Sequence, residues 1–320
     1  MPNTVLWREI QRHNFTSLKS LADFLELTPT QIKELDLHSL FPLNLPRRLA
    51  QKIPKRTLDG PIFRQFVPLI DEKIEKVGFS CDPLSENQAR PTPKLLHKYN
   101  ERALMLPTSG CAMNCRYCFR RHFAYETNKP GFEEELAYIR ADTSLREIIL
   151  SGGDPLSLSN PNLATLFTEL EQIPHLRRIR IHTRFPIGIP ERIDQELVDI
   201  LKACSLQIWF VIHCNHPTEL DVEVLEALKR VPAPLLCHSV LLRGVNDSIQ
   251  TLKALFERLV DHGITPYYLY QLDPIAGAAH FEVSEERGKA FMEELTLHLS
   301  GYALPKYVRE IAGQGSKTPV

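Results

Sequence analysis

The sequence lacks the long apolar run that a membrane-spanning helix needs. Crossing a bilayer takes roughly 20 consecutive apolar residues, and no stretch approaches that length although 43% of the 320 residues are hydrophobic. The opening residues, MPNTVLWREIQRHN, contain no apolar core of the kind that marks a secretory signal. We therefore expect a cytoplasmic protein with no membrane partner.

An excess of charge of either sign is also missing. The chain has 38 Lys and Arg residues against 39 Asp and Glu residues, which gives a formal net charge of -1. A basic field that would favour nucleic acid is therefore absent, and a small-molecule substrate is expected. A chain of this length can bury a large core, which fits one α/β domain with a smaller appendage.

The seven cysteines are an odd number, and they are unevenly distributed. Three of them lie within eight residues, as Cys111, Cys115 and Cys118, and the other four are scattered. In a cytoplasmic chain such a cluster indicates metal binding or catalysis rather than disulfides.

From residue 103 onward, short apolar runs alternate with amphipathic stretches, a pattern typical of a parallel sheet wrapped by helices. Runs such as IIL and IWFVI are apolar at consecutive positions, as in strands that are buried on both faces. A helical stripe at Ile249, Leu252, Leu255, Phe256 and Leu259 is one of the segments between them. The six expected strands are 103–108, 147–151, 179–183, 207–213, 235–242 and 267–271.

Six such units predict an α/β fold built as a partial (β/α)6 TIM-like barrel, with a doubly wound open sheet as the alternative. In both architectures ligands bind at the carboxyl ends of the strands. Residues 1–95 differ, because Leu18, Leu21, Ala22 and Leu25 form a helical stripe and Thr28-Pro29 resembles the start of another helix. They predict an N-terminal helical region.

The motif Cys111-Ala-Met-Asn-Cys115-Arg-Tyr-Cys118 follows the first expected strand and so lies at its carboxyl end. Three thiolates on a cluster of four irons leave one iron open to a substrate. We therefore predict a 4Fe-4S cluster on these cysteines. A structural zinc site, with His122 as its fourth ligand, and unliganded thiols are the alternatives.

The turn Ser151-Gly152-Gly153-Asp154-Pro155 directly follows the second expected strand. Its glycines allow the backbone to approach a ligand closely, and Asp154 can accept hydrogen bonds from an ammonium group. An ordinary tight turn is the alternative interpretation.

The cysteine spacing resembles that of the radical S-adenosylmethionine (SAM) superfamily. The resemblance implies that the methionyl group of SAM binds at the open iron, with Gly152, Gly153 and Asp154 as contacts. It also implies that one electron, from a donor such as flavodoxin or ferredoxin, cleaves SAM to a 5′-deoxyadenosyl radical.

A more specific resemblance covers most of residues 97–320. The segments KYNERALMLPTSGCAMNCRYCFRRHFA, ILSGGDPL, NHPTE, SVLLRGVND and PYYLYQLD are similar in order and spacing to lysine 2,3-aminomutases. The resemblance implies an isomerase that uses pyridoxal 5′-phosphate (PLP) and converts L-lysine to β-lysine. It divides the chain into the helical region 1–95, a radical SAM barrel 96–305 and a PLP-lysine segment 306–320.

The same resemblance assigns roles to six further residues. It makes Lys317 the Schiff-base lysine, and Lys98 and Arg102 the residues that bind the PLP phosphate. It gives the substrate carboxylate to Arg120 and the distal ammonium to Asp273, and Glu310 stands where the family has a second aspartate. Without the resemblance, Lys317 would be interpreted as a solvated tail residue and Arg120 as a surface arginine, while Lys98 and Arg102 would pair with Glu101.

Four residues that follow the third and fourth strands are additional candidates for the cavity lining, although histidines at strand ends are usually structural. They are His182, Arg184, His213 and His216.

The short chain resembles the branch of the family that supplies β-lysine for the modification of elongation factor P, where a separate lysyl ligase attaches it. One alternative is an aminomutase for glutamate or arginine, and an acidic Asp273 argues against glutamate. The other is a non-catalytic metal-binding module, against which Lys317 and the SGGD turn argue.

Overall fold

A single nine-stranded sheet organises the computed structural model, which describes residues 6–126 and 130–320. The strands follow one another in chain order, and each pair from β2 to β8 is parallel. β1 and β9 pair antiparallel at the two ends. The bounds are β1 Leu95–Tyr99, β2 Arg102–Met105, β3 Glu147–Leu150, β4 Arg178–Thr183, β5 Gln207–His213, β6 Leu235–Val240, β7 Ile264–Tyr270, β8 Lys306–Arg309 and β9 Thr318–Pro319.

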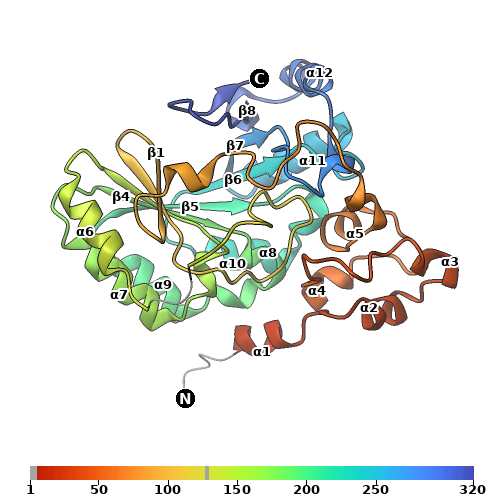
Figure 1. The fold of residues 1–320 in the computed structure, drawn as a ribbon, viewed down its shortest axis with the longest axis horizontal. Helices are drawn as coiled ribbons and strands as arrows, with labels where there is room; N and C mark the ends of the chain where they lie inside the picture. The colour runs from red at the N-terminus through yellow and green to blue at the C-terminus, as the bar shows by residue number, and fades with distance from the viewer. Residues whose placement is uncertain (1–5, 127–129) are drawn as a thin grey trace.

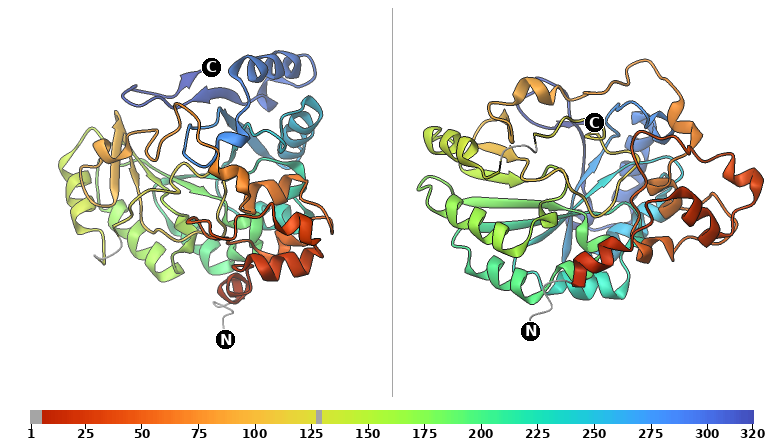
Figure 2. Two further views of the ribbon diagram at one scale, coloured as in Figure 1. Left: turned by 45° about the vertical axis from the view of Figure 1, so that its right-hand side comes forward. Right: turned by 60° about the horizontal axis from the view of Figure 1, so that its bottom comes forward.

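This strand order distinguishes a barrel from a doubly wound sheet. A doubly wound sheet reverses its order at a switch point, whereas a barrel keeps chain order. The sheet curves, and helices cover its outer face (Figures 1 and 2). Within the described residues β1 and β9 do not pair, so the barrel stays open. The predicted partial α/β barrel is confirmed.

All six expected strands are present, as β2 to β7. The count of six parallel strands was short by one, because β8 continues the parallel series. The segment was missed because exposed Lys306 and Arg309 flank its two buried residues, which hides the strand pattern. The helices after the first strands are α6 Glu133–Ala141, α7 Asn160–Glu171, α8 Phe185–Gly188, α9 Gln195–Ala203, α10 Val222–Lys229, α11 Ile249–Val260 and α12 Glu285–Thr296.

Within residues 6–95, the N-terminal region contains five short α-helices: α1 Leu6–Arg12, α2 Leu18–Leu25, α3 Pro29–Ile32, α4 Arg47–Ala50 and α5 Pro61–Phe66. The expected stripe lies on α2, where Ser17 caps the first turn. Thr28 and Gln31 form a capping box that starts α3. Both local predictions are confirmed, while the division of the chain at residues 95 and 305 stays a prediction.

The N-terminal region lies at the end of the sheet toward which the strand arrows point (Figure 1). The Trp7 ring meets the Phe185 ring of α8 edge-on at 5.3 Å. Further along, the backbone of Ser80 pairs with that of Ile275, beyond β7. These contacts place the region over the loops that follow the strands. No helix in 6–126 and 130–320 has the length and apolar character needed to cross a bilayer.

Candidate functional site

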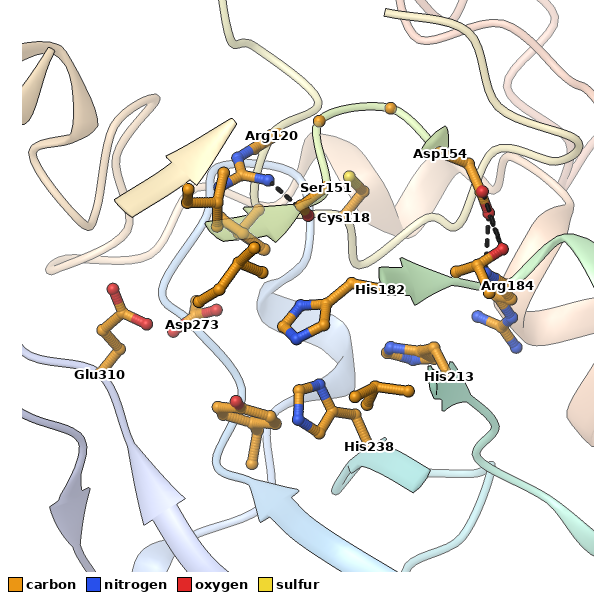
Figure 3. A pocket seen from close by; sticks show the side chains of 18 of the residues that line it. Cys118, Arg120, Ser151, Asp154, His182, Arg184, His213, His238, Asp273 and Glu310 are labelled. Atoms are coloured by element: carbon orange, nitrogen blue, oxygen red, sulfur yellow. Dashed lines mark hydrogen bonds between the residues drawn. The ribbon is translucent and has the colours of Figure 1, made fainter. Parts of the chain in front are cut away.

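The twelve residues to which the sequence and the family resemblance gave a role in the site line one cavity of about 580 Å³ inside the barrel. Most of these residues follow the strands at their carboxyl ends, as the architecture requires. Figure 3 shows several of them pointing toward one another from different strands. The individual roles stay predictions. The lining includes Lys98, Arg102, Cys111, Cys115, Cys118, Arg120, Gly152, Gly153, Asp154, Asp273, Glu310 and Lys317.

The cysteine loop follows β2 and is held from outside by the N-terminal region. Gln11 Nε2 and Asn44 Nδ2 donate hydrogen bonds to the Cys111 carbonyl oxygen, at 3.1 and 3.3 Å. Arg116, inside the motif, is fully buried and makes a two-point ion pair with Glu72, with both contacts at 2.6 Å. A planar guanidinium matched to a carboxylate is a rigid contact. The loop is therefore fixed before any cofactor binds.

Burial raises the pKa of the three partly buried thiols, and for Cys118 it is raised to about 11, with the neighbouring Cys115 adding to the effect. Bare thiols in this loop are therefore protonated. Coordinated iron reverses this preference, because a metal cation stabilises thiolates. The loop thus fits a cofactor that carries positive charge.

His122 does not join the cysteines as a zinc ligand in the structure. Its exposed ring contacts the Ala276 carbonyl oxygen through Nε2, at 3.1 Å. Among the described residues no group of three or more His, Cys, Asp or Glu side chains is arranged around a single metal ion. Because His122 contacts Ala276, it does not supply the fourth ligand that a closed structural zinc site takes.

The SGGD turn packs directly against the start of the cysteine loop. A Cβ on Gly153 would lie 2.3 Å from the Gly110 carbonyl oxygen, and Gly152 has a φ of +105°. Glycine is required at both positions, because no side chain fits the first and L residues avoid the second conformation. The close backbone approach is thus to the chain itself, and contact with SAM stays a prediction.

Asp154 connects the second and third strand ends. Its carboxylate accepts hydrogen bonds from the backbone N–H groups of Leu156, Arg184 and Phe185 at 2.7–3.0 Å, and from the Thr183 hydroxyl at 2.8 Å. It is 4% exposed. Asp154 therefore has a bracing role that the sequence did not suggest, while its contact with an ammonium group stays a prediction.

Arg120 is buried rather than on the surface, and its partner is Glu86. Nε and Nη2 of Arg120 donate to the two carboxylate oxygens of Glu86 at 2.7 and 2.9 Å. Nη1 donates to the Ser151 hydroxyl at 3.2 Å, across the carboxyl ends of β2 and β3 (Figure 3). One edge of the guanidinium is thus occupied by the protein, and Nη1 lies on the other edge.

Lys98, Glu310 and Lys317 form a charged row. Lys98 Nζ lies 2.9 Å from one Glu310 oxygen and Lys317 Nζ lies 2.7 Å from the other. Lys98 also lies 3.3 Å from Glu86. Burial alone would raise the pKa of Glu310, but the two lysines outweigh it and hold the pKa at about 2. Glu310 is therefore ionised at any working pH.

Lys317 is half-buried in the cavity rather than solvated, with Nζ 4.8 Å from the centre of the Tyr270 ring. The Arg102 guanidinium lies over the Tyr99 ring at 4.7 Å. Lys98 pairs with Glu310 and Glu86, so the expected alternative of pairing with Glu101 does not describe it.

Asp273 follows β7 and, in the part of the chain that the structure describes, forms no ion pair. Burial raises its pKa, and the negative charge of Glu310 adds to this, so that the pKa is about 7. When ionised, the Asp273 carboxylate therefore has no positively charged partner among the described residues. A ligand that carries an ammonium group would supply one.

Two imidazoles point into the cavity with nitrogens that no described residue satisfies. The Nε2 atoms of His182 and His238 are buried without a hydrogen-bond partner, and the rings lie 4.8 Å apart (Figure 3). Burial lowers the pKa of both rings, which are therefore neutral. Buried polar atoms of this kind normally have partners. The cavity thus fits a ligand that presents hydrogen-bonding atoms to these two nitrogens.

His213 and Arg184 also line the cavity, as expected, whereas His216 does not. The His216 ring caps the next turn by accepting a hydrogen bond from the Thr218 N–H at 3.2 Å. Sequence reasoning missed Glu86 and His238. His238 lies beside an irregularity in the β6–β7 register, a feature that re-aims side chains and leaves no sequence mark.

A comparison with family models defines the class of protein. Residues 105–265 match the radical SAM superfamily, so the chain is a member of that superfamily. Its members use a 4Fe-4S cluster together with SAM. The matched segment contains the three cysteines and the SGGD turn.

Comparisons with whole proteins narrow the class. "L-lysine 2,3-aminomutase" of Escherichia coli is 48% identical over 287 residues, which cover 88% of this chain and 84% of the relative. The enzyme of the same name from Haemophilus influenzae is 42% identical, with 98% and 94% covered. The one from Clostridium subterminale is 35% identical, with 98% and 77% covered. The chain belongs to the L-lysine 2,3-aminomutase family.

Proposed function

We propose that this protein is an L-lysine 2,3-aminomutase that converts L-lysine to β-lysine. The observation that carries the proposal is one cavity lined by the cysteine triad, by Lys317 and by Asp273, whose carboxylate forms no ion pair among the described residues. Family membership supports the reaction, and the cavity supports an amino-acid substrate with a second ammonium group.

Cys111, Cys115 and Cys118 would hold the 4Fe-4S cluster, and Lys317 would hold PLP, with Lys98 and Arg102 near its phosphate. When bound, the cluster with SAM supplies an organic radical, and PLP supplies the π system through which an amino group migrates. His182 and His238 would offer two neutral ring nitrogens to a ligand in the cavity.

The residues of the chain would orient the substrate between these groups. Arg120 can offer Nη1 to the α-carboxylate while Glu86 fixes the opposite edge. Asp273 and Glu310 would receive the distal ammonium, and both are available as carboxylates above about pH 7. The burial of Arg120 strengthens its charged contacts, because a low dielectric screens charges less than water does.

The finer assignments belong to the same proposal. We infer that the protein is cytoplasmic, that a flavodoxin or ferredoxin supplies the electron, and that the β-lysine serves elongation factor P through its lysyl ligase. The resemblance of the chain to the short branch of the family supports this use.

The test is anaerobic cluster reconstitution followed by incubation with labelled L-lysine, SAM, PLP and a reductant. We expect labelled β-lysine, and parallel reactions with L-glutamate and L-arginine should yield none. Cys118→Ser should lose cluster iron and activity, whereas Cys81→Ser, at an exposed cysteine outside the cavity, should keep both. Turnover of another amino acid in place of lysine would contradict the substrate assignment.

A further inference from the structure

Arg184 is a buried arginine that touches the cysteine motif. It directly follows β4 and is 7% exposed. Its Nη1 donates to the Cys115 sulfur at 3.0 Å and also contacts the Tyr117 hydroxyl. Tyr117 lies between Cys115 and Cys118, so the guanidinium contacts the motif at two points.

The orientation of Arg184 is fixed from the other side. Its Nη2 donates to Glu219 at 2.5 Å and to the Gln65 side-chain oxygen at 2.7 Å. Gln65 comes from α5 of the N-terminal region, and Glu219 from the turn after β5. Gln65 and Glu219 are joined by a hydrogen bond of 3.1 Å, and both are 0% exposed.

Glu219 is itself held rigidly. One of its oxygens accepts hydrogen bonds from the backbone N–H groups of Asn215 and His216, at 3.0 and 2.9 Å. Arg184 therefore has little freedom to turn away from Cys115. An arginine side chain stays a cation at any working pH, so Arg184 keeps a positive charge beside Cys115.

We propose that Arg184 is a positioning residue that sets the reduction potential of the cluster through Cys115. A hydrogen bond to a cluster sulfur and a nearby positive charge both stabilise the reduced cluster, which carries one more electron, and so raise its potential. The negative charge of Glu219 beside Arg184 reduces this rise in potential. Because Gln65 accepts a hydrogen bond from Arg184, the N-terminal region also helps to set the reduction potential.

The inference rests on the proposed cluster ligands, and the experiment separates the two. Wild-type protein is reconstituted anaerobically and titrated with dithionite and redox mediators, while the electron paramagnetic resonance (EPR) signal of the reduced cluster is followed. A wild-type protein that binds no cluster would contradict the ligand assignment. A wild-type cluster with a defined potential makes the variants interpretable.

Two variants should shift the potential in opposite directions. Arg184→Gln removes the cation and leaves Glu219 charged, so reduction should become at least tenfold less favourable, a shift of about −59 mV for one electron. Glu219→Gln keeps the Arg184 donor and removes the opposing charge, so the potential should rise. A general loosening of the loop would not produce shifts of opposite sign.

Arg192→Lys provides the matched control. Arg192 is another fully buried arginine, eight residues later, and it donates to the Leu156 and Leu158 carbonyl oxygens rather than to a cysteine. Its variant should keep the wild-type potential even if its melting temperature falls. If the Arg184→Gln variant fails to bind a cluster, the rise in reduction potential expected for Glu219→Gln still tests the proposal. An unchanged or lower potential in Glu219→Gln overturns the proposal.

Discussion

The raised pKa of Asp273 predicts that recognition of lysine depends on pH near neutrality. The pKa is about 7 because the group is buried and faces Glu310. Only the ionised carboxylate pairs with the ε-ammonium, so its ionised fraction in the free enzyme scales kcat/KM. That fraction rises from about one tenth at pH 6 to about nine tenths at pH 8, and this group alone should raise kcat/KM about tenfold.

Replacing Asp273 with asparagine should remove both the charge and this pH dependence. Truncating one partner of a buried charge pair costs about 2–5 kcal/mol, so kcat/KM at pH 8 should fall by at least about 30-fold. At pH 6 the difference from the wild type should be about tenfold smaller, because the wild-type carboxyl is then mostly protonated. Glu310 remains beside the ammonium, but it also carries the ion pair with Lys98, so we expect it to recover only part of this loss.

The assay measures initial rates of β-lysine formation under anaerobic conditions, with saturating SAM and PLP, from pH 6 to pH 8. Asp261→Asn, at an exposed position at the end of α11, serves as the control and should follow the wild-type profile. If Asp273→Asn keeps the tenfold rise between pH 6 and pH 8, another group titrates there and the reasoning fails.

Two further substitutions test the cavity. Lys317→Ala should abolish the absorbance band of enzyme-bound PLP, while Lys306→Ala, at an exposed position on β8, should leave it in place; a band that persists in the first variant shows that Lys317 is not the anchor. Gly153→Ala forces a Cβ to within 2.3 Å of the Gly110 carbonyl oxygen, so thermal unfolding should show a loss of roughly 1–3 kcal/mol and iron content should fall. Gly301→Ala meets open space at an ordinary φ and should stay within roughly 0.5 kcal/mol of the wild type; equal stability of the two variants would contradict the packing argument.

The barrel was predictable because its strands are buried on both faces and therefore apolar at consecutive positions. β5 shows this most clearly, with Phe210, Val211 and Ile212 all at most 1% exposed. β8 escaped because two buried residues between exposed charges look like any short tail. The antiparallel strand β9 was missed because it has only two residues.

The site was predictable where a motif or a strand end marked it. The rule that ligands bind at the carboxyl ends of strands places Cys111, Gly152 and Asp273 at one edge of the sheet from the sequence alone. Lys317 required the family resemblance, because nothing local distinguishes it from a tail lysine. The role of Glu86 could not be predicted, because its partner Arg120 lies 34 residues away in the sequence and the segment around Glu86 shows no hydrophobic periodicity.

The ion pair between Lys98 and Glu310 links the open edge of the barrel to the cavity. The sheet ends do not pair in the described chain, and the gap between them is bridged by Lys98 on β1 and Glu310 just beyond β8. An ion pair between two side chains thus connects the sheet ends, where a closed barrel has backbone hydrogen bonds between its first and last strands. Lys317 pairs with the same carboxylate, so a ligand that displaces Lys317 leaves Glu310 paired with Lys98 alone. Ligand binding in the cavity and the ion pair between the two sheet ends are therefore thermodynamically linked through Glu310.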